Sequence, residues 1–434
     1  MSNSAEIEDT GLLMMAAQLS RITHHRYDVL VLDAKLRQSL ATVRSLGRRG
    51  QSVAALETSN VPAFSSRWCQ QRFLYPENLD SFSYLAYLEN LLDRTGARVL
   101  IASSDGTIAL IRQYRERIES RTQIALAQEP ALAIATNKER TLSIAAQIGL
   151  NIPRSVVVRS VEEVPSALKE IGLPAVVKPV ESWVSGNQCC LLGRRVAPRL
   201  VTTSDEARIA VDELTFNEGT VLFQQFLSGR REAVSFLYAH HNIYARFAQW
   251  AKRTDPPLGG TSVLRQSMAI PEDSGMQAER LIREINLEGY SEVEFRRDDV
   301  GIPYLMEINP RLSASVEIAI RSGVDFPCLL YQWACGERIE SVESYRTGKW
   351  MRYLRGDIMT TIASLQQQGL PGIASPAQTI RDFWLSFLQP MDYDYLDWSD
   401  PIPALKAMTS FTQSWIGGAI IKRLSHMKMR TETF

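Results

Sequence analysis

The sequence predicts a protein of mixed α/β and α+β class that is divided into several packed units. The chain has 434 residues, more than one hydrophobic core usually accommodates, so roughly two or three units are expected. Near the N-terminus, apolar runs alternate with helix-like stretches, which is typical of a parallel sheet with crossover helices. From Pro130 onward, β-rich segments lie between helical ones, which predicts an α+β region after the first unit.

Residues 23–125 are predicted to form a Rossmann-like, doubly wound domain. An apolar run at Tyr27–Asp33 is followed by a helix-like stretch and a second strand-like run at Ser52–Leu56. A further strand at Arg98–Ala102 ends in the polar segment Ser103–Gly106, as ligand-facing loops of open parallel sheets do. The loop after the first strand lacks the glycines of the dinucleotide fingerprint, so dinucleotide binding is not expected here.

Composition and charge exclude several classes of function. Hydrophobic residues make up 45% and charged residues 22% of the chain, which is ordinary for a globular protein and argues against disorder. Lys+Arg and Asp+Glu both number 48, so the global basic field that non-specific nucleic-acid binding requires is missing. No apolar run reaches the length of a transmembrane helix. We therefore expect small-molecule partners, with no nucleic acid and no transmembrane segment.

The cysteines and the N-terminal residues indicate a cytoplasmic protein. Five cysteines form no C-x-x-C pair, and an odd number in a long chain favours free thiols in a reducing compartment. Residues 1–22 carry Glu6, Glu8 and Asp9 instead of the basic start and longer apolar core of a secretory signal. Residues 1–22 are expected to be a flexible tail.

A cluster of oxygen ligands is predicted on a β-hairpin within Ser291–Arg311, whose sequence is SEVEFRRDDVGIPYLMEINPR. Two strand-like runs flank Asp298–Gly301, which is typical of a hairpin turn. Carboxylate and amide oxygens without His or Cys suit Mg²⁺. A solvated hairpin with incidental acids is the alternative. The expected ligands are Glu294, Glu307 and Asn309.

The register of this hairpin decides whether the ligands meet. If a four-residue loop sets it, Glu294 faces Leu305 and Glu292 faces Glu307. Side chains alternate between faces, so the carboxylates then share one face and Met306 lies on the opposite, apolar face. A slip by one residue would separate the carboxylates.

The pattern E-x-F followed by L-M-E-I-N-P-R resembles the metal motif of the ATP-grasp superfamily, which includes carboxylate–amine ligases and enzymes like carbamoyl phosphate synthase. The resemblance implies that Glu294 and Glu307 hold one or two Mg²⁺ on the phosphates of ATP. Asn309 would complete this site, and Arg311 would steady an acyl phosphate.

The resemblance extends over roughly residues 25 to 335 and implies a division into domains. Residues 23–125 would be the pre-ATP-grasp domain. Residues 126–335 would form a two-subdomain ATP-grasp core, with a small lid subdomain at about residues 155–225. Residues 336–434 form an extra C-terminal segment that the motifs do not explain; packing, a partner and an anionic membrane all stay open for its last helix.

Two lysines stand where ATP-grasp enzymes contact the nucleotide phosphates. Lys138 follows Asn137 at the predicted start of a helix, and Lys178 lies in the apolar strand Ala175–Val180. Lys178 could instead snorkel from an edge strand, which is the alternative without the family resemblance.

The segment Val221–Glu232 resembles the hinge between the ATP-grasp subdomains, with an exposed edge strand as the alternative. The resemblance implies that Glu232 accepts hydrogen bonds from ribose hydroxyls. In this sequence Gln224 stands where the family commonly has an acidic hinge residue, and Arg230–Arg231 adds one residue before Glu232. The loop after Lys178, Glu181–Gln188, would close over the phosphates but has a single glycine. Serine side chains of this loop would therefore contact the phosphates together with that glycine. The expected nucleotide contacts are Ser185, Gly186, Gln224, Gln225, Phe226 and Leu227.

A Pro- and Gly-rich loop at Arg253–Arg265 is the expected cover of the substrate. The resemblance makes Arg265 a candidate contact of the transferred phosphate or of a substrate carboxylate. A surface turn with solvated arginines is the alternative.

Together these motifs imply an ATP-dependent ligase with ATP and Mg²⁺ as cofactors and a small-molecule carboxylate and amine as substrates. The carboxylate would be activated as an acyl phosphate and captured by the amine. A carboxylase that activates bicarbonate, and a non-catalytic ATP-binding sensor or scaffold, are the alternatives. A homodimer is left open as the assembly.

Overall fold

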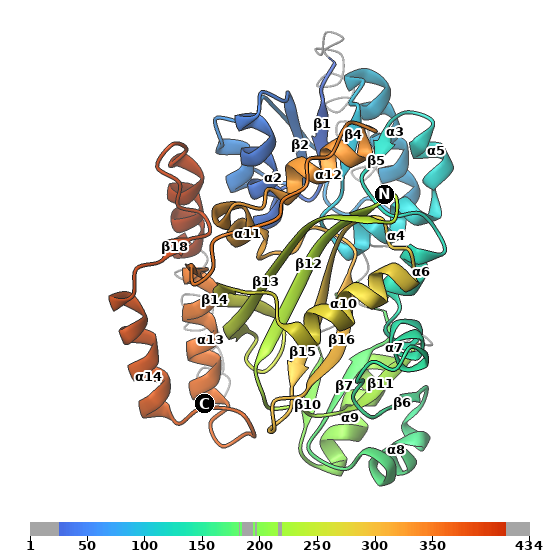
Figure 1. Ribbon diagram of the computed structural model, residues 1–434, viewed down its shortest axis with the longest axis vertical. Coiled ribbons are helices and arrows are strands. Elements are labelled where there is room, and N and C mark those ends of the chain that lie inside the picture. Colours follow the sequence, from blue (N-terminus) through green and yellow to red (C-terminus); the bar gives the residue numbers. More distant parts are fainter. Residues whose placement is uncertain (1–25, 182, 185–193, 196–197, 216–218, 414–434) are drawn as a thin grey trace, which may run out of the picture.

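The computed structural model describes residues 26–181, 183–184, 194–195, 198–215 and 219–413. Three sheets organise this part of the chain, and Figure 1 shows them from the N-terminal sheet in blue to the C-terminal helices in red. A two-stranded ribbon of β8 (Trp183–Val184) and β9 (Arg194–Arg195) accompanies them.

The N-terminal sheet has five parallel strands in the order β3-β2-β1-β4-β5. Strands β1, β2 and β4 are fully buried, which explains why the sequence shows continuous apolar runs rather than alternation. The predicted Rossmann-like order of elements is therefore confirmed. The strands are β1 Val29–Val31, β2 Val53–Glu57, β3 Gln71–Leu74, β4 Val99–Ile101 and β5 Gln123–Ile124, and the helices are α2 Arg37–Arg48, α3 Ser81–Thr95, α4 Asp105–Gln113 and α5 Arg115–Glu119.

A smaller antiparallel sheet follows in the order β10-β7-β11-β6. Helices α8 and α9 cover one face and share a separate hydrophobic core with it. The opposite face carries Lys178, which is paired with Leu222 of the central strand β11. The strands are β6 Ser155–Val158, β7 Ala175–Pro179, β10 Arg199–Val201 and β11 Val221–Gln225, and the helices are α8 Val164–Ile171 and α9 Ser204–Thr215.

The largest sheet has seven strands in the order β16-β15-β12-β13-β14-β17-β18. Helix α10 packs on one face, against Val234 and Phe236 of β12, and Figure 1 shows it crossing in front of the strands. Helices α11 and α12 pack on the other face, against Leu237 and Phe247. The strands are β12 Arg231–Ala239, β13 Asn242–Asp255, β14 Thr261–Met268, β15 Gly289–Arg297, β16 Pro303–Asn309, β17 Trp350–Arg352 and β18 Asp392–Tyr393, and the helices are α10 Glu272–Glu284, α11 Val316–Ser322 and α12 Phe326–Ala334.

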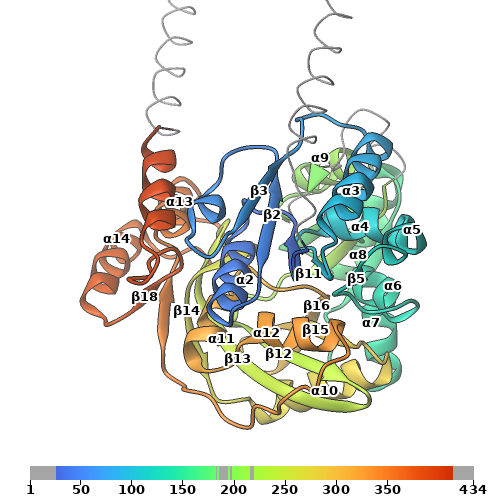
Figure 2. The same ribbon diagram turned by 90° about the horizontal axis from the view of Figure 1, so that it is seen from above.

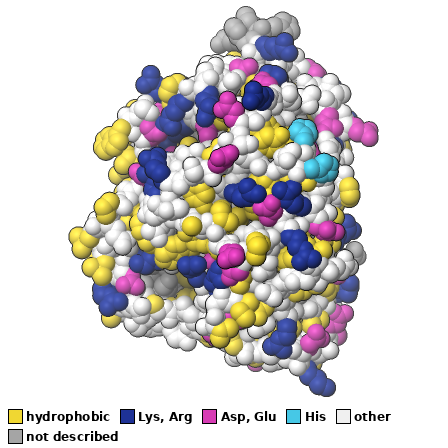
Figure 3. Space-filling view, viewed as in Figure 1, with side chains coloured by type: hydrophobic (Ala, Val, Ile, Leu, Met, Phe, Trp, Pro, Cys, Tyr) yellow, Lys and Arg dark blue, Asp and Glu magenta, His cyan; other side chains and the backbone are white. Residues whose placement is uncertain are grey.

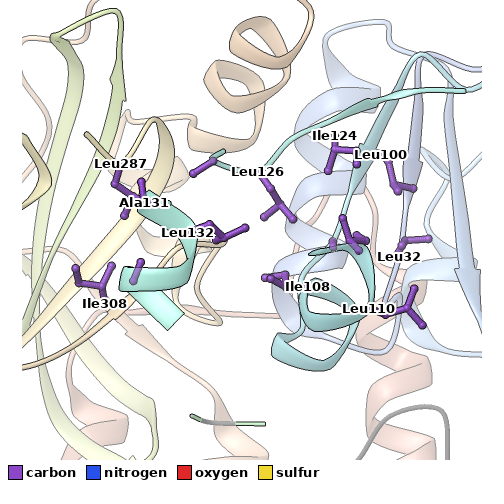
Figure 4. Packing of buried hydrophobic residues seen from close by; sticks show 14 of the residues in the cluster. Leu32, Leu100, Ile108, Leu110, Ile124, Leu126, Ala131, Leu132, Leu287 and Ile308 are labelled. Atoms are coloured by element: carbon purple, nitrogen blue, oxygen red, sulfur yellow. The ribbon is translucent and has the colours of Figure 1, made fainter. Parts of the chain in front are cut away.

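Helices α6 (Ala131–Thr136) and α7 (Lys138–Gln147) join the first domain to the large sheet. Figure 4 shows Leu132 of α6 on the side of Leu287 and Ile308, with Leu126 leading across to Ile108 and the first domain. All of these side chains belong to one cluster of buried residues. The first domain and the large sheet therefore share a continuous core, which fixes their relative position.

The segment after Gly336 extends the large sheet and also reaches the first domain. Strands β17 and β18 lengthen the sheet beyond β14, and α13 (Leu354–Gln366) and α14 (Pro376–Leu385) follow β17. Arg44 of α2 donates to Asp400 over 2.9 Å, and both side chains are 1% exposed. Figure 2 shows these C-terminal helices beside the blue first domain.

Part of the C-terminal segment is covered with exposed apolar side chains. Figure 3 shows apolar residues gathered over the part of this face where α13 and α14 lie in Figure 1. No helix in the described ranges is both long and apolar enough to span a membrane. The exposed apolar side chains of this segment are Met359, Ile380, Trp384, Leu385, Phe387, Leu388, Trp398, Ile402, Leu405 and Met408.

Candidate active site

A cavity of about 580 Å³ lies where the first domain, the small sheet and the large sheet meet. The C-terminal segment also contributes Tyr353 and Tyr395 to its wall. The segment Ser103–Gly106, expected from the sequence to be a ligand-facing loop, lines it as well, and so does Ser313–Ser315. The volume is in the range of small-molecule sites. Of the predicted site residues, those that line the cavity are Lys138, Lys178, Glu294, Glu307, Asn309 and Arg311.

The hairpin that carries the carboxylates has a different register from the predicted one. Its loop is longer, so Arg297 pairs with Pro303, and a β-bulge on β16 follows opposite Glu294 and Phe295 of β15. Glu294 therefore faces Glu307 directly, instead of Leu305 as predicted. The expected clustering of carboxylates still occurs, because the longer loop and the bulge each shift the pairing by one residue, and a shift by two residues keeps side chains on the same face.

The same bulge exchanges the predicted faces of two neighbouring residues. Leu305 pairs with Phe295 and is fully buried in the core, although it was expected beside the carboxylates. Met306, expected in the core, is the unpaired bulge residue, and its carbonyl oxygen accepts a hydrogen bond from Nζ of Lys178 at 3.4 Å. The bulge thus turns a backbone oxygen toward the cavity lysine.

The two facing carboxylates have different electrostatic surroundings. Burial raises the pKa of Glu294, and the neighbouring Arg231 guanidinium only partly opposes this shift. Burial also opposes the ionisation of Glu307, but Lys138 and Lys178 hold the pKa of this carboxyl below its ordinary value. Glu307 is therefore a stable anion, and Glu294 depends on a cation beside it.

Arg231 supplies that cation. Its guanidinium makes a bidentate contact with the carboxylate of Glu294, with Nε 3.0 Å from Oε2, and donates to the carbonyl of Gly260 at 2.5 Å. The side-chain amide of Asn309 also donates to Glu294 over 3.0 Å. Glu294 is thus held from both sides.

The two predicted lysines lie beside Glu307. Asn137 caps α7 by accepting from the backbone N–H of Arg140, and this places Lys138 at the first position of the helix, as predicted. Nζ of Lys138 is 3.4 Å from Oε2 of Glu307. Burial lowers the pKa of Lys178 to about 8, with Glu307 acting in the opposite direction. Lys178 is central to its sheet, so the alternative of an exposed edge lysine is wrong.

Arg311 is oriented by a carboxylate of the first domain. Its Nε is 2.5 Å from Oδ1 of Asp105 and its Nη2 is 3.1 Å from Oδ2. Nη2 also lies 3.4 Å from Oδ1 of Asn309. The bidentate pair fixes the plane of the guanidinium at the cavity wall.

The carboxylate and amide oxygens at the hairpin fit a hard divalent cation that would also be bound by substrate phosphates. Glu292, Glu294 and Glu307 lie on one face, where their carboxylate oxygens offer ligands of the kind that Mg²⁺ prefers. Within the described ranges, no group of three His, Cys, Asp or Glu side chains gathers into a metal site by itself. This agrees with Mg²⁺, which takes one or two carboxylates and completes its shell with water and substrate phosphates.

The hinge residues lie between the small and large sheets, but they do not line the cavity. Gln224 is fully buried, and neither its amide nitrogen nor its oxygen has a hydrogen-bond partner among the described residues. Leu227 is buried, and Gln225 and Phe226 are partly buried at the end of β11. Their contact with adenine stays a prediction.

The expected role of Glu232 at the ribose is not compatible with its position. Glu232 pairs with Phe295 on the α10 side of the sheet, opposite to the face of Glu294. Arg297 donates to both of its oxygens over 3.0 and 2.7 Å, and Ser274 donates over 2.7 Å. The added residue in Arg230–Arg231 places Arg231, and not Glu232, on the cavity face.

Arg265 is also a correction to the sequence analysis. It was expected to contact phosphate or substrate, but it is fully buried and outside the cavity wall. Its guanidinium holds Asp394, the residue directly after β18, in a bidentate pair, with Nη1 3.1 Å from Oδ2. Arg265 therefore attaches the C-terminal segment to β14. Ser185 and Gly186, the predicted lid contacts, lie outside the described residues.

Sequence reasoning did not single out Arg231, Asp105, Tyr353 or Tyr395 of the wall as functional candidates. Arg231 was noted only as an extra hinge residue, and Asp105 only as part of a strand-end loop. Tyr353 and Tyr395 gave no signal, because their position depends on contacts with residues far away in the sequence. A search for charged pairs at strand ends could have singled out Asp105.

Comparison with known proteins connects this site to one superfamily. A family model described as "ATP-grasp in the biosynthetic pathway with Ter operon" matches residues 221–356. The D-alanine–D-alanine ligase of Nitrosospira multiformis is 24% identical over 181 residues, covering 41% of this chain and 58% of that protein. The chain thus matches little more than half the length of this relative.

Two solved structures share the fold at low identity. One is the biotin carboxylase domain of Hydrogenobacter thermophilus 2-oxoglutarate carboxylase, solved as a dimer in complex with MgADP, ADP and bicarbonate. It is 16% identical to this chain, with a TM-score of 0.60, and the match covers 75% of this chain and 74% of that one. The L-amino acid ligase of Bacillus licheniformis is 17% identical, with a TM-score of 0.56 and coverage of 73% and 76%. The family match and the sequence relative both relate this chain to the ATP-grasp superfamily, and the two solved structures share its fold.

Proposed function

We propose that this chain is a Mg-ATP-dependent ligase that activates a substrate carboxylate as an acyl phosphate and joins it to an amine. The reaction would form a C–N bond and release ADP and phosphate. The observation that carries the proposal is the pairing of Glu294 with Glu307 beside Lys138 and Lys178, at the wall of a cavity large enough for substrates. The superfamily supports the ATP-dependent activation of a carboxylate.

Each residue has a distinct task in this proposal. Glu294, Glu307 and Asn309 would hold Mg²⁺, which when bound neutralises phosphate charge during transfer. Lys138 and Lys178 would contact the phosphates of ATP from the side of Glu307. Arg311, held by Asp105, would present a fixed guanidinium to the acyl phosphate.

ATP and Mg²⁺ as cofactors, the domain limits given above and a cytoplasmic location belong to the same proposal. Cys69, Cys328 and Cys335 carry free thiols in the described part of the chain, which supports a reducing compartment. Adenine contact at Gln224–Leu227 is supported by the unpartnered, buried amide of Gln224.

Acyl-phosphate formation can be tested without knowing the amine. The protein is incubated with MgATP, a panel of carboxylic and amino acids, and hydroxylamine, which converts an acyl phosphate into a hydroxamate. We expect hydroxamate and ADP to appear with at least one acid. ADP release that depends on bicarbonate alone would instead identify a carboxylase, and ATP binding without any turnover would identify a sensor or scaffold.

Substitution of Glu307 by glutamine tests the site directly. Glu307→Gln is expected to lower hydroxamate formation at least about a hundredfold, because the carboxylate charge that would hold the cation is lost while the side chain keeps its size. Circular dichroism should be unchanged. Unaltered turnover in this variant would contradict the assignment.

A further inference from the structure

A second end of the cavity is built by Arg37, Asp255, Tyr353 and Tyr395. Arg37 opens α2 of the first domain, and Asp255 ends β13 of the large sheet. Tyr353 and Tyr395 come from the C-terminal segment, and their ring centroids are 6.0 Å apart. Three regions of the chain therefore converge on this end of the cavity.

Asp255 is a carboxylate without a partner. Among the described residues, neither of its side-chain oxygens accepts a hydrogen bond or forms an ion pair, although the residue is only partly exposed. Burial raises its pKa, and Arg37 and Arg355 oppose this shift. A partly buried, unpaired anion loses the solvation that water would give it and favours a cationic ligand.

Arg37 offers the complementary charge. Its Nη1 donates to Asp394 over 2.7 Å, and its guanidinium carbon lies 4.1 Å from the centre of the Tyr353 ring. In the described part of the chain, Nε and Nη2 of Arg37 donate to no acceptor. Arg37 and Asp255 influence each other electrostatically, yet no ion pair joins them. Two opposite charges that are not joined to each other thus line the same cavity.

This end of the cavity is connected to the proposed phosphate site. Asp255 pairs with Thr261 across β13 and β14, and Gly260 beside it accepts the hydrogen bond from Arg231. Arg231 in turn holds Glu294. Gly260, Thr261 and Asp255 all line the one cavity. A molecule bound at Asp255 would therefore share the cavity with the reacting phosphate.

We propose that Arg37 and Asp255 form a binding site for an α-amino acid, with its ammonium group on Asp255 and its carboxylate on Arg37. Tyr353 and Tyr395 border the site and would contact the side chain. A ligand with a carboxylate alone would leave Asp255 without a partner, and one with an ammonium group alone would leave Nε and Nη2 of Arg37 without acceptors. A zwitterion satisfies both. The inference rests on the proposed function, in which the amino acid is a substrate.

The test is equilibrium binding to the full-length protein. The proteinogenic amino acids, in both enantiomers, are screened by ligand-observed NMR, and each binder is compared with its analogue that lacks the ammonium group or the carboxylate. We expect at least one amino acid to bind about tenfold or more tightly than either analogue. Asp255→Asn should remove this preference, and Asp212→Asn, on the exposed face of α9, should retain it.

Binding of MgATP by calorimetry separates this inference from the proposed function. The Asp255→Asn variant is expected to bind MgATP as the unaltered protein does, because Asp255 lies outside the lysine and carboxylate cluster. No binding of any amino acid, or unchanged amino-acid binding by Asp255→Asn, would overturn the amino-acid site. Amino-acid binding without any binding of MgATP would instead overturn the proposed function and leave the site in place.

Discussion

At the residue scale, the site concentrates charge that the protein balances only partly by itself. Lys178 is buried against the bulge carbonyl of Met306, and Glu294 has Arg231 as its counter-ion. Both arrangements leave groups whose charge state depends on what enters the cavity. A ligand that carries phosphate would stabilise the charged form of Lys178, and a divalent cation would replace part of the role of Arg231.

The pH dependence of ATP binding should report on Lys178. With a pKa of about 8 in the free protein, Lys178 loses its proton as the pH rises above this value, so ATP must then bind together with a proton. We expect ATP affinity to be constant below about pH 7 and to fall by up to tenfold per pH unit above about pH 8. Calorimetry at several pH values measures this dependence.

Two variants separate the charge of Lys178 from its shape. In Lys178→Arg the guanidinium stays protonated over the whole pH range, so ATP affinity should no longer decline above pH 8. Lys178→Met should bind ATP weakly at every pH. Affinity in Lys178→Met equal to that of the unaltered protein would show that the lysine does not contact phosphate.

Substitution of Arg231 should make the fold more dependent on the cation. Arg231→Ala leaves Glu294 buried without its bidentate partner, which is expected to lower the Tm in the presence of a chelator. MgADP should then raise the Tm by more than it does in the unaltered protein, because Mg²⁺ supplies the missing positive charge. Arg230→Ala, which removes a half-exposed contact with Glu232, is the control. An equal response to MgADP in both variants would contradict this prediction.

At the scale of elements, the β-bulge in the carboxylate hairpin is the feature that sequence reasoning could not supply. The alternating pattern of Glu292, Glu294 and Glu307 predicted two strands and their shared face. The register depended on loop length and on one unpaired residue, and neither leaves a mark in local composition. The predicted cluster was correct in its members and wrong in the pairs that form it.

Deletion of Met306 should show what the bulge contributes. Because Met306 is unpaired, its removal should leave Glu294 opposite Glu307 and produce a regular hairpin. The carbonyl that accepts the hydrogen bond from Lys178 would be lost, so we expect ATP affinity to fall by about tenfold with a smaller change in Tm. Thermal melting and calorimetry on the same variant check both parts, and unchanged ATP affinity would assign the bulge no role at the phosphate site.

At the scale of the whole molecule, the C-terminal segment is tied to the rest by buried ion pairs. Asp394 is shared by Arg37 and Arg265, and Asp400 holds Arg44. Asp400 also accepts hydrogen bonds from Ser66 and from the backbone of Arg67. These contacts join residues that lie between 129 and 357 positions apart, so no local pattern could reveal them. Arg265 was mistaken for a substrate contact for this reason. Continuous apolar runs, by contrast, correctly predicted strands β1, β2 and β4 of the first sheet.

Removal of one of these charges should destabilise the protein as a whole. Asp400→Asn leaves Arg44 buried without a counter-ion, and breaking such a pair costs about 3–5 kcal/mol. We expect a clear fall in the urea midpoint measured by tryptophan fluorescence. Glu213→Gln, which breaks a half-exposed pair with Arg199, should change stability by less than about 1 kcal/mol. Equal effects of the two substitutions would mean that Asp400 does not anchor the segment.

The pair between Arg44 and Asp400 also has a consequence during synthesis. The two residues are 356 positions apart, so Arg44 leaves the ribosome long before its partner exists. At about 5–20 residues per second, this interval is roughly 20 to 70 seconds. During this interval Arg44 has not yet gained its counter-ion Asp400. The part of the cavity wall that Tyr353 and Tyr395 form is also missing. A nascent chain should therefore hold no finished pocket until the segment from Tyr353 to Asp400 has been made.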